Sequence, residues 1–271
     1  MRSTGRPPLR MCQNRGVARE SSLFIGVSSK AYLGYAATTS WLAAARAALL
    51  ARPELGLQHI QVFVAPSTPM LIQAQAALAD TSCWVGAQDG QWQTGAATGA
   101  VSMQLLAELG LDFVELGHAE RYRVFGETEG ETRRKADAAS AAGLKALFCI
   151  GEPERTTEKD AAEHCLEQIR DVVADGGFPL DRMLLAYEPW WSIGAEFPAP
   201  PAYVNGVIAG VRQRVREEFG ASALGVLYGG SAGPGTLAPL TEADGLFLGR
   251  FAHDPANFAR VLDDAIGLRR G

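Results

Sequence analysis

Residues 113–121 read F-V-E-L-G-H-A-E-R, a mostly apolar run that ends at Gly117 and is followed at once by His118 and Glu120. A strand that is buried on both faces has a nearly continuous apolar sequence, and glycine is typical of the turn that follows it. A histidine at this point is either an ordinary surface residue or a residue that the strand delivers to a site. The rest of the sequence provides the evidence that distinguishes these two interpretations.

Seven further apolar runs of similar length occur along the chain, separated by longer segments rich in Ala, Leu, Glu and Arg. The runs are nearly continuous rather than alternating, which is typical of parallel strands covered on both faces. Several intervening segments are compatible with helices, among them 41–51, 157–174 and 203–219. The eight runs are 24–29, 60–66, 83–88, 113–117, 145–151, 183–189, 225–230 and 245–250.

This alternation, repeated eight times over about 250 residues, predicts an α/β protein with a single (β/α)8 barrel. A doubly wound open sheet is the alternative, but no G-x-G-x-x-G sequence follows the first run. No change in composition marks a second domain. We therefore expect one barrel domain over residues 23–271.

The composition excludes several classes of partner. The chain has 271 residues, 47% of them hydrophobic, and its formal net charge of −5 gives no general affinity for nucleic acid or anionic membranes. No run approaches the roughly 20 apolar residues that span a bilayer. The cysteines have no C-x-x-C spacing, and the sequence shows no secretory leader, so we expect a soluble cytoplasmic protein with free thiols. These cysteines are Cys12, Cys83, Cys149 and Cys165.

Residues 1–22 differ from the sequence that follows. They contain five arginines, one glutamate and two adjacent prolines, with no apolar stretch long enough for a signal peptide. We expect a disordered N-terminal extension here, with Met11 as a second candidate for the initiator methionine.

Titratable and glycine-rich segments follow the predicted strands. In (β/α)8 barrels the active site lies where strands end and the βα loops begin, so these segments are expected to meet at one end of the barrel. They are Ser28-Ser29-Lys30 after the first run, His118 and Glu120 after the fourth, Cys149 and Glu152 at the fifth, Glu188 at the sixth, Gly229-Gly230-Ser231 at the seventh, and Gly249-Arg250 at the eighth.

The residue types at these ends are suited to proton abstraction next to a carbonyl of a phosphorylated substrate. Glycines after the seventh and eighth strands let backbone N–H groups approach a phosphate. Lys30 can supply a fixed positive charge, Glu188 can act as a general base, and His118 can donate a hydrogen bond to a substrate oxygen.

Each residue also has a structural interpretation when it is taken alone. Lys30 could be a solvated loop lysine, and His118 could be a hydrogen-bonded structural residue. Glu120 is near Arg121 and Arg123, which favours an ion pair. Cys149 is expected to be a packing residue rather than a nucleophile, because no activating group follows it.

Seven segments in order resemble the triosephosphate isomerase family, over about residues 24–262. Their number and order make the resemblance specific. They are G-A-Q-D-x-x-W-Q-T-G-A-A-T-G (86–99), V-E-L-G-H-A-E-R (114–121), F-G-E-T (125–128), C-I-G-E (149–152), A-Y-E-P-W-W-S-I-G (186–194), Y-G-G-S (228–231) and D-G-L-F-L-G (244–249).

The resemblance implies a TIM barrel that interconverts dihydroxyacetone phosphate and glyceraldehyde 3-phosphate, or a close analogue, without a cofactor or metal. It implies a glutamate base beside a neutral histidine, which is the family's known arrangement, and a homodimer. The implied catalytic residues are Lys30, His118 and Glu188, with Glu120, Cys149 and Ser28 in support, Gly194, Ser231, Gly249 and Arg250 at the phosphate, and Thr98 at the dimer contact.

Several positions around these residues depart from the family pattern. Ser28 stands where the family has asparagine, Ser29 replaces an aromatic residue, Ala119 replaces serine and Arg250 replaces glycine. The lid segment 193–201 reads I-G-A-E-F-P-A-P-P, which is longer and richer in proline than usual. These departures resemble a branch that includes tetrulose-phosphate isomerases. A tetrulose phosphate is therefore the alternative substrate, and a non-catalytic sugar-phosphate-binding paralogue is the alternative from another class of function.

Overall fold

The computed structural model describes residues 22–193 and 198–270 and forms a closed barrel of eight parallel strands in sequential order. The predicted (β/α)8 barrel is confirmed. Most strands stop one or two residues before the end of the predicted run, because the chain turns there into the βα loop. The strands are β1 (Leu23–Ser28), β2 (Ile60–Ala65), β3 (Trp84–Ala87), β4 (Phe113–Leu116), β5 (Lys145–Ile150), β6 (Met183–Tyr187), β7 (Gly225–Tyr228) and β8 (Gly245–Leu248).

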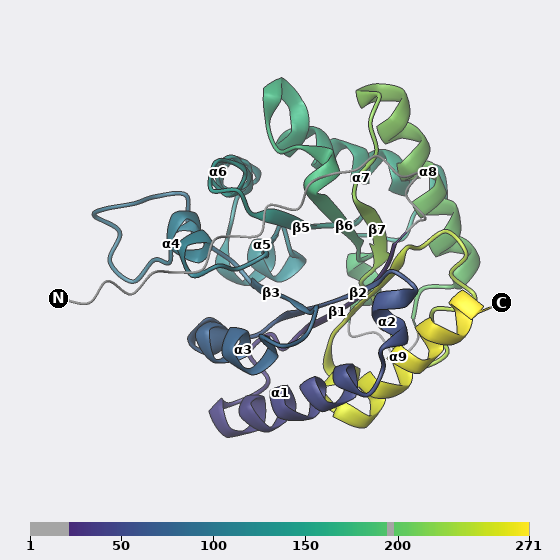
Figure 1. Ribbon diagram of the computed structural model, residues 1–271. Coiled ribbons are helices and arrows are strands. Elements are labelled where there is room, and N and C mark those ends of the chain that lie inside the picture. The colour runs from purple at the N-terminus through teal and green to yellow at the C-terminus, as the bar shows by residue number, and fades with distance from the viewer. Residues whose placement is uncertain (1–21, 194–197, 271) are drawn as a thin grey trace.

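Helices surround the barrel on the outside, as Figure 1 shows. The first helix begins at Tyr35, six residues before the predicted segment, because Thr38 and Thr39 donate their hydroxyls to carbonyls one turn earlier and so fit within the helix. The helices are α1 (Tyr35–Leu50), α2 (Glu54–Leu57), α3 (Leu71–Leu78), α4 (Met103–Glu108), α5 (Ala119–Phe125), α6 (Glu129–Ala141), α7 (Glu158–Val173), α8 (Pro201–Phe219) and α9 (Pro255–Arg270).

The barrel closes where β1 pairs with β8, from Phe24 opposite Gly245 to Val27 opposite Leu248. Outside this seam, helices α1 and α9 pack side by side, purple and yellow in Figure 1. Because every strand pair is parallel, all eight carboxyl ends lie at the same end of the barrel. The topology therefore brings the loops that follow the strands together.

The interior of the barrel is filled with side chains and is centred on Phe63. The Phe63 ring meets Phe113 edge-on at a centroid distance of 5.3 Å and stacks on Phe247 at 5.9 Å. Gly26 makes room for it, since a Cβ at that position would lie 2.0 Å from the Phe63 ring. This packed layer fills the inside of the barrel next to the carboxyl ends of the strands.

Some sequence-based expectations concern residues outside the described ranges. The expected N-terminal extension falls almost entirely on residues 1–21, and the phosphate-binding assignment of Gly194 falls on segment 194–197, so both stay predictions. No helix within the described ranges has the length and apolar character needed to cross a membrane.

Gly26→Ala should destabilise the protein by about 1–3 kcal/mol, because the added methyl group overpacks the interior against Phe63. Gly267→Ala is the matched control. Gly267 lies in α9 with open space around its Cα, so alanine should raise stability by about 0.5–1 kcal/mol. Urea unfolding of both variants checks the two signs, and an equally stable Gly26→Ala protein would contradict the packing described.

Candidate active site

His118 is presented by the turn at the end of β4. Gly117 has φ +68°, and a Cβ there would lie 2.7 Å from the Phe148 ring, so glycine is required both for the turn and for the space. His118 then caps helix α5, and its Nδ1 accepts a hydrogen bond from the Glu120 N–H at 3.0 Å. Because Nδ1 is the acceptor, the proton of the neutral ring lies on Nε2.

Glu188 reaches the same point from the end of β6. Its N–H donates to the Ile150 carbonyl at 2.8 Å, which fixes the backbone just beyond the strand. Glu188 Oε2 lies 3.2 Å from His118 Nε2, and both side chains are buried. The two atoms are close but not aligned as a hydrogen bond, so the Nε2 of His118 has no hydrogen-bond partner among the described residues. This proton remains available to a substrate oxygen.

The Glu188 side chain packs against Gly229, which follows β7 directly. A Cβ at Gly229 would lie 2.5 Å from Glu188 Cγ, so any larger residue would displace the carboxylate. The glycine-rich seventh loop predicted for phosphate binding therefore also leaves room for Glu188.

Lys30 follows β1 in a left-handed backbone conformation, with φ +44°. Such a conformation is uncommon for a residue other than glycine and is often found at functional sites. The Lys30 Nζ donates to Glu120 Oε1 at 2.9 Å. The prediction that Glu120 forms an ion pair with a neighbouring arginine is wrong, because Arg121 instead pairs with Asp89 and Glu127. Glu120 contacts Lys30, as the family resemblance implies.

The charges at this end of the barrel shift one another's pKa values. Burial opposes the charge on Lys30, but Glu188 and Glu120 raise the Lys30 pKa above its usual value overall. Burial likewise opposes the charge on Glu120, and its contact with Lys30 lowers the Glu120 pKa overall. Lys30 and Glu120 therefore stay ionised together.

His118 is subject to opposing influences. Burial lowers its pKa, but the carboxylates of Glu188 and Glu115 raise it by more, so the pKa lies above its usual value. The N–H that Glu120 donates to Nδ1 opposes protonation, since a protonated Nδ1 could no longer accept it. The neutral ring that the family resemblance implies thus depends on this backbone hydrogen bond.

Of the four residues predicted to bind phosphate, the three that lie within the described ranges line one large hollow with Lys30 and Glu188. Ser231, Gly249 and Arg250 lie on its wall. The Arg250 side chain is exposed at the rim, and its guanidinium lies over the Tyr32 ring, 5.7 Å from the centroid. Thr98, the predicted dimer contact, is exposed in the loop between β3 and α4, away from this hollow.

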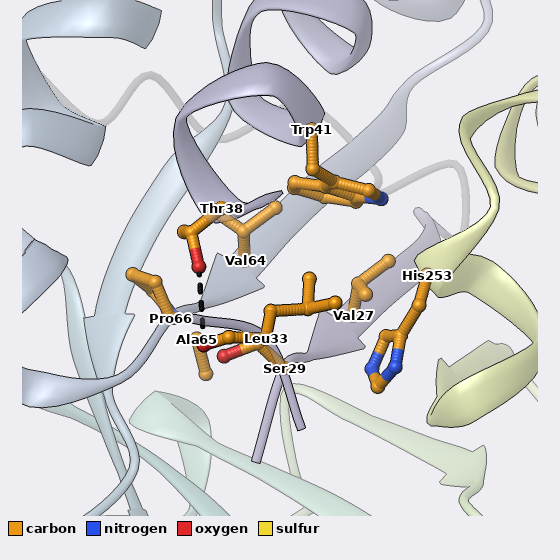
Figure 2. Close-up of a pocket in the computed structure, with 9 residues that line it drawn as sticks. All are labelled: Val27, Ser29, Leu33, Thr38, Trp41, Val64, Ala65, Pro66 and His253. Carbon is orange, nitrogen blue, oxygen red and sulfur yellow. Dashed lines mark hydrogen bonds between the residues drawn. The ribbon is translucent and has the colours of Figure 1, made fainter. Parts of the chain in front are cut away.

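The two serines that depart from the family pattern support the Lys30 loop. Ser28 is buried, and its Oγ accepts the Lys30 N–H at 3.3 Å. The Ser29 Oγ accepts the N–H of Ser67 at 3.1 Å. Figure 2 shows Ser29 beside a small pocket that is lined by Leu33 and His253 among others. Ser28 lines the hollow with Lys30, and its side chain is shorter than asparagine, so the wall of the site is less filled at this position. Ser29 lines the small pocket instead of the hollow.

Cys149 lies on the inner face of β5 and is buried. Burial raises the pKa of its thiol well above the usual value, so the thiol stays protonated. This agrees with a packing role and disfavours a nucleophile.

Glu152, whose role was not predicted from the sequence, connects four segments around the lid. Its Oε1 accepts hydrogen bonds from Trp191 Nε1 at 2.8 Å, from the Tyr203 hydroxyl at 2.9 Å and from the Tyr187 hydroxyl at 3.1 Å. Trp191 lies two residues before the first residue of the lid, and Tyr203 lies in α8 just after it. Glu152 therefore anchors both ends of the segment that the resemblance identifies as the lid.

Glu115, in the middle of β4, is a further residue whose role was not predicted from the sequence. It shares the inward face of the strand with Phe113 and is buried, and its Oε2 has no hydrogen-bond partner among the described residues. Burial raises the pKa of Glu115 to about 7. The available signal was a glutamate within an otherwise apolar strand, since an unpaired buried carboxylate is costly.

Several known proteins are similar to this chain in sequence or in structure. Residues 23–265 match the family model described as Triosephosphate isomerase. The L-erythrulose-1-phosphate isomerase of Pectobacterium atrosepticum is 41% identical over 250 residues, which are 91% of this chain and 96% of that protein. The triosephosphate isomerase of Alkalilimnicola ehrlichii is 34% identical over 215 residues, which are 76% of this chain and 86% of that protein. The crystal structure of triosephosphate isomerase from Bartonella henselae matches with a TM-score of 0.74 at 26% identity, over 89% of this chain and 98% of that one.

Glu115→Gln should change how stability depends on pH. The folded-state pKa of about 7 exceeds the ordinary 4.5, so the folded protein binds more protons than the unfolded chain between these values, and Glu115 removes stability as pH rises through them. Relative to the parent, the variant should therefore gain stability between pH 5 and pH 8, by at most about 3 kcal/mol. Urea unfolding at both pH values measures this, and a stability difference that does not vary with pH would contradict it.

Proposed function

This chain belongs to the triosephosphate isomerase family of sugar-phosphate isomerases, and we propose that its substrate is a four-carbon ketose phosphate, L-erythrulose 1-phosphate. The observation that carries the proposal is the 41% identity to an L-erythrulose-1-phosphate isomerase over 91% of the chain. Two more relatives of that name are 38% and 39% identical. Triose phosphates, the family's usual substrates, are the alternative.

The proposed reaction moves a proton between neighbouring carbons. In L-erythrulose 1-phosphate the carbonyl is at carbon 2, so removal of the proton from carbon 3 gives an enediolate. Return of a proton to carbon 2 leaves the carbonyl on carbon 3, while the hydroxyl proton passes to the other oxygen. Carbon 3 carries a hydroxymethyl group, so the product is a second ketose phosphate. With a triose phosphate the same step interconverts ketose and aldose.

Glu188 is the proposed base, because it lies buried at the end of a strand, and Gly229 leaves its carboxylate unobstructed. A positioned group of this kind is typically worth about 10²–10⁴ in rate. His118 donates its free Nε2 proton to the two substrate oxygens in turn, and Lys30 balances the negative charge of the enediolate. Each well-placed donor contributes roughly 3–4 kcal/mol to such a transition state.

The phosphate is proposed to bind at the ends of β7 and β8, near Ser231 and Gly249, with Gly194 of the lid as a further predicted contact. The exposed guanidinium of Arg250 is at the rim of the same hollow. This arrangement holds the phosphate on one side of the Glu188 and His118 pair. The rest of the substrate then extends past them toward Ser28 and β4.

A non-catalytic binding protein is disfavoured, because Lys30, His118 and Glu188 are all retained and converge at one end of the barrel. The homodimer with Thr98 at its contact, and the cytoplasmic location, remain proposals drawn from the family resemblance and the composition.

Glu188→Asp should lower kcat at least about 100-fold, because the shorter side chain withdraws the carboxylate from the substrate carbon. The assay compares turnover of L-erythrulose 1-phosphate with that of the triose phosphates, and the parent protein should prefer the tetrulose. Glu154→Asp is the matched control, since Glu154 is exposed in the loop after β5 and should leave kcat unchanged. Full activity of Glu188→Asp would remove Glu188 from the mechanism, and a preference for triose phosphates would reverse the substrate assignment.

Arg250→Gly restores the residue typical of the family and tests the phosphate role of this side chain. Because the guanidinium is exposed, its contribution to phosphate binding should be small, and KM should rise about 5-fold with kcat nearly unchanged. Steady-state kinetics with the sugar phosphate provide the measurement. An unchanged KM would mean that Arg250 faces solvent over Tyr32 and that the backbone alone binds the phosphate.

A further inference from the structure

Glu115 differs from Glu127 and Glu152, two other buried glutamates of the described chain. Glu127 accepts from Lys135 Nζ at 2.6 Å and from Arg121 Nε at 2.9 Å, and Glu152 has three donors. Within the described ranges, Glu115 is the one carboxylate with a buried oxygen that lacks a hydrogen-bond partner. A buried polar group left unpaired is destabilising, so its presence calls for a partner that the protein itself does not supply.

Glu115 lies three residues before His118 in the chain, inside the barrel and close to the candidate active site. It lies opposite Leu147 of β5 in register, on the inward face of β4, and two residues before the turn at Gly117. Its charge acts on the Lys30 ammonium and on the His118 imidazole, and it also interacts with the Glu188 carboxylate. The carboxyl group of Glu115 is therefore within electrostatic reach of all three proposed catalytic residues.

Next to the larger Leu147, several small side chains lie on the inner face of the barrel near this level. Ser28 ends β1, Ala65 ends β2, Cys149 lies near the end of β5 and Ala186 near the end of β6, and all four are buried. Ser28 is also the position where the family resemblance leads one to expect the longer asparagine. A short hydroxyl side chain and an unpaired carboxyl thus replace a larger amide at the inner end of the site.

We propose that Glu115 binds the terminal hydroxyl of a four-carbon substrate and so determines the preference for it over a triose phosphate. The inference rests on the proposed function. With the phosphate held at β7 and β8 and the reacting carbons between Glu188 and His118, the fourth carbon lies on the side away from the phosphate, toward Ser28 and Glu115. A triose phosphate has no atom to place there.

The chemistry of a hydroxyl group suits this carboxyl in either protonation state. A hydroxyl donates to an ionised carboxylate and accepts from a protonated one. A substrate without the hydroxyl leaves the Glu115 Oε2 unpaired, and sites built to bind a substrate hydroxyl discriminate strongly against analogues that lack it. The same carboxyl thereby selects the four-carbon compound and disfavours the three-carbon one.

Substitution of Glu115 separates this role from a structural one. Glu115→Leu should lower kcat/KM for L-erythrulose 1-phosphate about 10- to 100-fold, while kcat/KM for the triose phosphates changes by less than about 3-fold. Its Tm should be unchanged or higher, because the leucine replaces an unpaired buried carboxyl. Glu115→Gln, which can still form a hydrogen bond, should retain more of the tetrulose activity than the leucine variant.

Glu127→Gln is the matched control, a buried glutamate that is fully paired and lies outside the proposed substrate path. It should lower Tm and leave the ratio of the two kcat/KM values unchanged. Equal losses on both substrates with a lower Tm in Glu115→Leu, or an unchanged ratio, would overturn the inference while leaving the proposed function intact. A parent protein that turns over triose phosphates but not the tetrulose would instead overturn the proposed function, and this inference with it.

Discussion

The proposed chemistry depends on the approach of two side chains from strands β4 and β6, which are separated in the barrel by β5 alone. His118 Nε2 and Glu188 Oε2 lie 3.2 Å apart, although 70 residues separate them in the chain. Each is placed by a rigid strand, and each needs a glycine beside it, Gly117 for the turn and Gly229 for the space. The proposed base and the proposed hydrogen-bond donor therefore lie close together before substrate binds.

The electrostatics of the site follow from this pair. Lys30 is paired with Glu120, and the backbone N–H of Glu120 also fixes the tautomer of His118. One residue thus orients both a positive charge and a neutral donor. Buried carboxylates raise the His118 pKa, so the hydrogen bond to its Nδ1 is what favours the neutral ring. A neutral ring can donate to each substrate oxygen without a second charge in the site.

The sequence was sufficient for the barrel and for the approximate position of the site, because eight buried runs and the residues at their ends are local features. It was insufficient where a role depends on a partner far along the chain. The pairing of Glu120 with Lys30 spans 90 residues, and neighbouring arginines suggested another partner. Glu152 has hydrogen-bond partners in three later segments. Glu115 lies within an otherwise apolar run, where the sequence pattern predicts only a buried strand. What marks Glu115 is the partner it lacks, which only the folded structure reveals.

The central claim is that a single carboxylate moves a proton between neighbouring carbons at the His118 and Glu188 pair. Its most direct test is the isomerisation of L-erythrulose 1-phosphate in D2O, followed by proton NMR of the product. A carboxylate that exchanges its proton with solvent should introduce deuterium at the carbon that is reprotonated, and Glu188→Gln should abolish both turnover and incorporation. A Glu188→Gln protein that still formed product with deuterium at the reprotonated carbon would contradict the account.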